Sequence, residues 1–251
     1  MKLLFENWRK YLAEGGKQAK IDALKADKEK FINSLEQKLV SITDFDKLFQ
    51  ELEIMPMGKQ GHSARVGGYV SGATKDPDAV IGALMHDYVE RHPDGPAAIE
   101  ALFDKGLISD GAKEIVIFLS STAEDVAEYA GDNEPLHHIQ QVLTTMKNVK
   151  LKTKLAMIKA GDRVDNLNRR VWEPERKGPL TSKKGIKYLK KSADLFNFLL
   201  KHSKGPDVGA VIQALEPEAQ TLLAKVDPSM AGFFDRRRQS IASQDKRGYR
   251  E

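Results

Sequence analysis

Apolar residues recur three and four positions apart along most of the chain, and no run alternates apolar and polar residues as a half-buried strand would. This pattern predicts an all-α fold. We expect helices over 3–12, 19–42, 45–52, 62–70, 96–105, 109–122, 135–146, 151–171, 184–202, 208–215 and 217–226. Glycines or prolines separate several of these segments, and the stretch 174–179 is expected to be a loop.

One further helix is predicted to begin at Asp76-Pro77, because an aspartate cap followed by proline in the first turn is a favoured start. It is expected to run to the break at 92–95 and to carry His86 and Asp87 inside an apolar stretch. Histidine and aspartate are unusual on a face that otherwise buries hydrophobic side chains, and both are good ligands for a divalent metal.

Two more residues complete a candidate metal site. His62 begins the helix at 62–70, and Asp162 interrupts the apolar pattern of 151–171. Two imidazoles and two carboxylates form a mixed nitrogen and oxygen set that suits manganese first, and iron, zinc or nickel as well. Adjacent helical residues diverge by about 100°. His86 and Asp87 therefore share one ion only if it lies over their helix, with His62 and Asp162 closing from other helices.

Polar residues one helical turn from the carboxylate ligands suggest chemistry beyond metal storage. Glu90 follows Asp87 by three residues and Asn166 follows Asp162 by four, so each is expected on the same helix face as its ligand. A carboxylate at the first position can orient or deprotonate a water at the metal. An amide at the second can form hydrogen bonds with a substrate.

These motifs resemble those of the HD-domain phosphohydrolases, in particular the small alarmone hydrolases and the hydrolase domain of Rel-type enzymes. The similarity spans about residues 45–203 and rests on three segments: 62–66, 83–90 and 158–167. It implies an HD-domain helical bundle. The organisation expected is an N-terminal helical extension (1–44), the hydrolase domain (45–203), C-terminal helices packed on it (204–230) and a basic tail (231–251).

The resemblance further implies manganese-dependent removal of pyrophosphate from the 3′ position of guanosine tetra- or pentaphosphate. It assigns His62, His86, Asp87 and Asp162 as metal ligands. It gives Glu90 the role of activating water, and it places Asn166 and Tyr188 against the nucleotide. Two other enzyme or binding functions remain open: an HD-type nucleotidase or phosphatase acting on another nucleotide, and an HD module that binds a nucleotide or protein without turnover.

The chain departs from the family pattern at two places. Arg91 follows the glutamate where the family has aspartate, and a basic residue there is a candidate phosphate ligand. The residues 57–61 replace the basic pair and tyrosine-proline stretch that usually precede the first histidine, which leaves Lys59 as the phosphate partner in this segment.

Composition restricts the class of protein. In 251 residues, 41% are hydrophobic and 30% are charged, which is typical of a globular domain. No apolar stretch approaches the roughly 20 residues of a membrane span, the start is not a secretory signal, and there is no cysteine, so a cytoplasmic location is expected. The net charge of +4 suits an anionic small molecule. Nucleic acid is not expected as a partner, since the arginines at 236–238 are interpreted as a solvated tail.

Two features carry no assigned chemistry. His137 and His138 are interpreted as ordinary helix-start residues. The opening residues 1–12 resemble short leader segments of marine phage proteins and are expected to pack on the domain as a helix.

Overall fold

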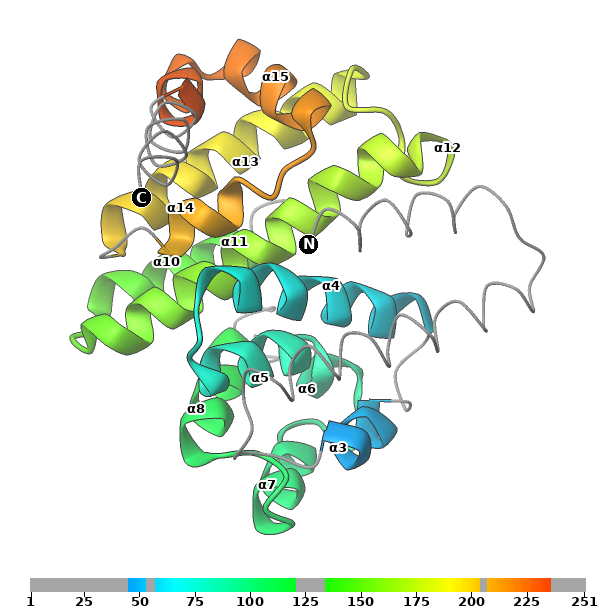
Figure 1. The fold of residues 1–251 in the computed structure, drawn as a ribbon, viewed down its shortest axis with the longest axis vertical. Helices are drawn as coiled ribbons and strands as arrows, with labels where there is room; N and C mark the ends of the chain where they lie inside the picture. Colours follow the sequence, from blue (N-terminus) through cyan, green and yellow to red (C-terminus); the bar gives the residue numbers. More distant parts are fainter. Residues whose placement is uncertain (1–44, 53–56, 121–133, 204–206, 236–251) are drawn as a thin grey trace, which may run out of the picture.

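The structure is a computed structural model that describes residues 45–52, 57–120, 134–203 and 207–235. Within these ranges the chain is helical and contains no strand, which confirms the all-α prediction (Figure 1). The helices are α3 (Phe45–Leu52), α4 (Met57–Ala73), α5 (Pro77–Met85), α6 (Tyr88–Arg91), α7 (Pro96–Asp104), α8 (Asp110–Leu119), α10 (Glu134–Thr145), α11 (Val149–Trp172), α12 (Pro174–Lys177), α13 (Lys183–His202), α14 (Asp207–Ile212) and α15 (Pro217–Val226). The helices expected at 3–12 and 19–42 lie outside the described residues.

Helix α11 is the centre of the bundle. It packs against α4, α5 and α8 on one side and against α13 and α14 on the other (Figure 1). Helix α11 therefore lies between these two groups of helices. Its core residues Leu155, Ile158 and Leu167 are fully buried. At Gly161 a β-carbon would come within 3.2 Å of Val66, so the missing side chain allows α4 and α11 to approach closely. This contact places the middle of α4, one turn after His62, next to the middle of α11.

Side-chain caps explain why several helix starts were predictable. Asp76 accepts a hydrogen bond from the backbone of α5 and is followed by proline, as expected. Ser109, Asn148 and Ser182 cap α8, α11 and α13 in the same way. Each satisfies backbone N–H groups that the first helical turn leaves without a partner.

Three sequence expectations require correction. The helix that begins at Asp76-Pro77 ends at Met85, so His86 and Asp87 lie in a turn before α6 rather than within one helix. The loop expected at 174–179 contains the one-turn helix α12. A tail was expected from residue 231, but residues 231–235 belong to a helical segment that begins at 228 and buries Met230 and Phe234.

Candidate metal centre

Three segments that are distant in sequence meet at the candidate metal centre. His62 comes from the second turn of α4, Asp162 from the middle of α11, and His86 with Asp87 from the turn between α5 and α6. That turn matters for geometry. The α-helical hydrogen bonding stops after Met85, and the His86 Nε2 and Asp87 Oδ1 atoms lie 3.4 Å apart. Two neighbouring residues thus present their ligand atoms to the same point.

The ligand atoms form a compact cluster. Those of His62, His86 and Asp87 lie within 4.8 Å of one another. The two imidazole Nε2 atoms are 3.2 Å apart, and Asp162 joins through its Oδ1 atom, 3.2 Å from His62 Nε2. Both histidines are almost fully buried, whereas the carboxylates keep some exposure. The cluster is therefore open to solvent on its carboxylate side.

Hydrogen bonds on the far side of each ring leave both Nε2 atoms facing the cluster. His62 Nδ1 donates to Asp165 Oδ2 at 2.7 Å, and His86 Nδ1 donates to the carbonyl oxygen of Ala83 at 2.8 Å. A histidine that ligates a metal commonly has its second nitrogen held in this way, by a carboxylate or a backbone carbonyl. The donor set and its orientation fit a divalent cation.

The protonation states fit the same interpretation. Burial alone would lower the pKa of His62, but its hydrogen bonds to Asp162 and Asp165 and the charges of those carboxylates outweigh burial and raise this pKa to about 9. Burial lowers the pKa of His86. Burial would raise the pKa of Asp162, yet the hydrogen bond and charge of His62 bring it below its usual range. A divalent cation bound at His62 Nε2 would have to displace the proton that this raised pKa favours.

Asp165 is the main site residue that sequence reasoning missed. It is fully buried, and besides His62 it accepts two hydrogen bonds from Arg65, one of them from Arg65 Nη2 at 2.9 Å. Burial would raise its pKa, but the charge of Arg65 leads the opposing effects and lowers it. The available signal was spacing: Asp165 follows Asp162 by three residues, and Arg65 follows His62 by three, so each pair shares a helix face.

Asn166 lies at the site but contacts a ligand. Its side-chain amide donates to Asp162 Oδ1 at 2.7 Å and to the Asp162 carbonyl at 3.0 Å. The expected position on the Asp162 face is therefore observed. The amide nitrogen orients the carboxylate, whereas contact with a substrate stays a prediction.

The remaining candidates are more peripheral. Glu90 and Arg91 are exposed on the single-turn helix α6, directly after the Asp87 turn. Lys59 belongs to the first turn of α4, and its side chain lies outside what the structure describes. His138, in α10, shares a hydrogen bond with the Phe118 carbonyl at 3.1 Å, in keeping with a structural role.

Tyr188, which the resemblance places against the nucleotide, lies next to two arginines of α11. The guanidinium carbons of Arg163 and Arg170 lie 4.7 and 4.5 Å from the centre of its ring. Burial raises the pKa of its hydroxyl. Contact between Tyr188 and a nucleotide stays a prediction.

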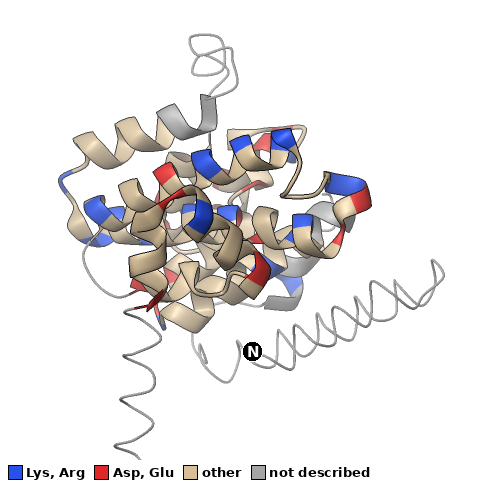
Figure 2. Ribbon diagram, turned by 90° about the horizontal axis from the view of Figure 1, so that it is seen from above, with Lys and Arg blue, Asp and Glu red and all other residues tan. Residues whose placement is uncertain are grey.

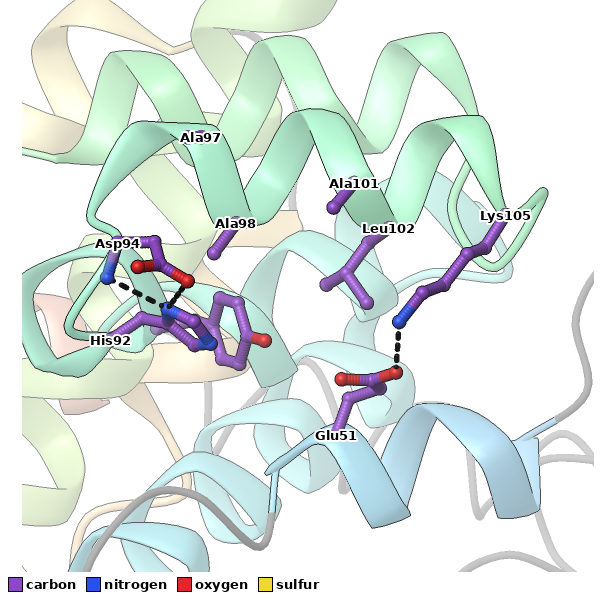
Figure 3. A pocket seen from close by; sticks show the side chains of 9 residues that line it. Glu51, His92, Asp94, Ala97, Ala98, Ala101, Leu102 and Lys105 are labelled. Atoms are coloured by element: carbon purple, nitrogen blue, oxygen red, sulfur yellow. Dashed lines mark hydrogen bonds and ion pairs between the residues drawn. The ribbon is translucent and has the colours of Figure 1, made fainter.

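A separate cavity of about 260 Å³ lies between α3 and α7 (Figure 3). Alanine and leucine side chains of α7 line one wall, the Glu51–Lys105 ion pair (2.7 Å) lies at one end, and His92 and Asp94 lie at the other. None of the four candidate ligands lines this cavity.

Basic and acidic residues are interspersed over the helices (Figure 2). Among the described residues, no helix has both the length and the apolar character needed to cross a membrane. Comparison with protein-family models, curated proteins and solved structures gave no match.

Proposed function

We propose that this protein is a metal-dependent phosphohydrolase of the HD type that removes pyrophosphate from the 3′ position of guanosine tetra- or pentaphosphate. The observation that carries the proposal is the cluster of His62, His86 and Asp87 ligand atoms, with Asp162 Oδ1 3.2 Å from His62 Nε2 and the two histidine Nε2 atoms 3.2 Å apart. Manganese is the cation proposed, since nitrogen and oxygen ligands without sulfur suit it.

The surroundings of the cluster support catalysis rather than storage. A divalent cation bound there would lower the pKa of a water molecule and polarise a phosphate oxygen. The partly exposed Asp87 and Asp162 leave the substrate side accessible. Glu90, in the helix that follows Asp87, is proposed as the carboxylate that accepts a proton from the attacking water.

The substrate assay separates three possible functions. Metal-free protein is incubated with Mn²⁺ and guanosine tetraphosphate, deoxynucleoside monophosphates or a nicotinamide dinucleotide phosphate, and the products are identified. We expect pyrophosphate from the tetraphosphate, and Asp87→Ala should abolish it. Asp94→Ala, a matched change at an exposed carboxylate, should not. Orthophosphate from monophosphates alone would reject the proposal in favour of a nucleotidase, and metal binding without turnover would favour a binding module.

Glu90→Gln tests the proton acceptor. We expect kcat to fall by about 10²- to 10⁴-fold while Mn²⁺ affinity is retained. Glu100→Gln, at another exposed glutamate, should keep the full rate.

One observation favours the broader alternative of a nucleotidase or phosphatase. Asn166 was expected to contact the nucleotide, but its amide nitrogen donates its hydrogen bonds to Asp162. Asn166 is one of the residues on which the specific resemblance to the alarmone enzymes rests. Its contact with Asp162 gives it a role in orienting a metal ligand, and that role would serve any phosphorylated substrate.

A further inference from the structure

Two arginines of α11 surround one aromatic ring of α13. Arg163 and Arg170 lie over Tyr188 with their guanidinium carbons 4.7 and 4.5 Å from its centre. An arginine over an aromatic ring is held in place by attraction to the π-electrons as well as by packing. The ring therefore fixes the orientation of both side chains, which we call the arginine pair.

The arginine pair carries positive charge that no described carboxylate neutralises. The hydrogen bond of Arg163 is to the Ser192 hydroxyl at 3.5 Å. Arg170 donates to the backbone carbonyls of Lys177 and Gly178 at 2.5 and 3.2 Å. In the residues that the structure covers, neither guanidinium has an acidic side chain within 4.0 Å.

Other arginines of the same region are neutralised. Arg65 pairs with Asp165, and Arg169, adjacent to Arg170, pairs with Glu173 at 3.1 Å. Partial burial of a charge is unfavourable without a partner. The arginine pair is half-buried and still open to solvent, so an anion from solution can reach it.

The position of the arginine pair relates it to the metal centre. Arg163 directly follows Asp162 in α11. The negative charges of Asp162 and Asp165 are close enough to the Tyr188 hydroxyl to contribute to its raised pKa. Arg170 lies seven residues, or two turns, further along α11, at a rise of about 10 Å. The two guanidinium groups thus meet at one ring, although their backbone positions are two turns apart on the helix that also carries Asp162.

We propose that Arg163 and Arg170 bind a second phosphate or pyrophosphate group of the substrate, apart from the one that meets the metal centre. Guanidinium groups match phosphate oxygens in charge and in hydrogen-bond geometry. Tyr188 is a positioning residue that acts through the two arginines. This inference deepens the proposed function and rests on it for the identity of the substrate: a nucleotide with phosphates at two positions would engage both sites, whereas a monophosphate would engage one.

Pyrophosphate binding tests the site without metal or turnover. Pyrophosphate is titrated into the metal-free full-length protein by calorimetry. We expect Arg163→Gln and Arg170→Gln each to raise Kd at least about tenfold, since a charge-assisted hydrogen bond is lost. Tyr188→Leu should have a similar effect and Tyr188→Phe, which keeps the ring, very little. Arg176→Gln, at an exposed arginine of α12, is the matched control and should leave Kd unchanged.

Two further measurements separate the possible outcomes. Circular dichroism checks that each variant is folded. If Arg163→Gln is unstable, Arg163→Lys replaces it as a variant that keeps the positive charge. The Arg163→Lys protein should bind pyrophosphate more tightly than the Arg163→Gln protein. The proposed site would be rejected if Arg163→Gln and Arg170→Gln both bound pyrophosphate with the wild-type Kd, or if Arg176→Gln lost as much affinity as they do. The proposed function is tested separately. It would be rejected if the protein did not bind Mn²⁺ or did not cleave guanosine tetraphosphate, even if the arginine variants had lost pyrophosphate binding.

Discussion

At the scale of single residues, His62 joins the ligand cluster to the protein interior. One ring nitrogen faces His86 and Asp162, while the other donates to Asp165, which is itself held by Arg65. A neutral imidazole presents a lone pair at only one nitrogen. With Nδ1 bonded to a carboxylate, the lone pair must lie at Nε2, where a cation would bind.

This dependence predicts the effect of Asp165→Asn on metal affinity. An amide can donate to His62 Nδ1 and favour the other tautomer, so we expect Mn²⁺ Kd to rise by about 10- to 100-fold. Stability should fall too, since Arg65 loses its buried partner, which costs about 3 to 5 kcal/mol. Titration followed by electron paramagnetic resonance, on protein verified as folded, measures Kd. Asp194→Asn on the exposed face of α13 is the control, and unchanged affinity in Asp165→Asn would contradict the role of Asp165.

The sequence allowed the four ligands to be proposed but not their supporting residues. His86 and Asp87 were visible because their polarity conflicts with the apolar run around them. Asp165 lies 103 residues from His62, and no local pattern shows that these two side chains meet. For Tyr188, only the family resemblance suggested a position near the site, and the arginines over its ring depend on the packing of α11 against α13.

At the scale of elements, the sequence predicted helices correctly where apolar periodicity and capping residues agree. It did not predict a helix boundary where the apolar run continues through a turn. The residues on both sides of His86-Asp87 are buried, so their hydrophobicity resembles one uninterrupted helix. Only the tertiary structure shows that α5 ends at Met85. The same turn brings the His86 and Asp87 ligand atoms together, so the wrong helix boundary and the geometry of the candidate site arise from one feature.

Gly82 in α5 allows a close helix contact that can be tested. A β-carbon there would overlap the side chain of Ile115 in α8 and come within 3.3 Å of Ile158 in α11. Alanine is favoured over glycine in a helix by about 1 kcal/mol, but overpacking a core costs about 1 to 3 kcal/mol. We therefore expect Gly82→Ala to reduce the free energy of unfolding, as measured in urea. Ile115→Leu, which moves the branch away from the β-carbon, should recover part of the loss in the double variant.

Asp227 stabilises the start of the helical segment 228–235. Its Oδ1 accepts from the Ser229 backbone N–H at 2.8 Å, and its Oδ2 accepts from Asn197 at 2.8 Å. Hydrogen bonds from Ser229 lead the effects that lower its pKa. Because the folded-state pKa is lower than the unfolded one, the stabilisation is present above about pH 4 and declines as the pH falls further.

We therefore expect Asp227→Ala to lower the free energy of unfolding by about 1 kcal/mol at pH 7, and by less at pH 3. Thermal unfolding across this pH range measures the difference. Asp104→Ala, at an exposed residue of α7, should show little effect at either pH. A difference that grows toward acid pH would contradict the assignment.

At the scale of the whole molecule, the candidate metal centre brings together residues that lie far apart in the sequence. The ligands come from α4, the α5–α6 turn and α11, so they converge only in the folded protein. A cation that binds this arrangement must stabilise the fold, because the unfolded chain offers no comparable site. The predicted fold class required only local patterns, whereas this convergence depends on how α4 and α5 pack against α11.

Thermal unfolding should therefore depend on manganese concentration. At a free concentration of about 100 times Kd, binding adds about 2.7 kcal/mol. For a protein of this size that corresponds to a rise in Tm of roughly 5 to 10 °C. Asp87→Ala should lose most of the rise because a ligand is missing, while His202→Gln, where the ring stacks on Phe198 in α13, should keep it. An equal rise in both variants would place the bound manganese elsewhere in the protein, since only one of them changes the proposed ligand set.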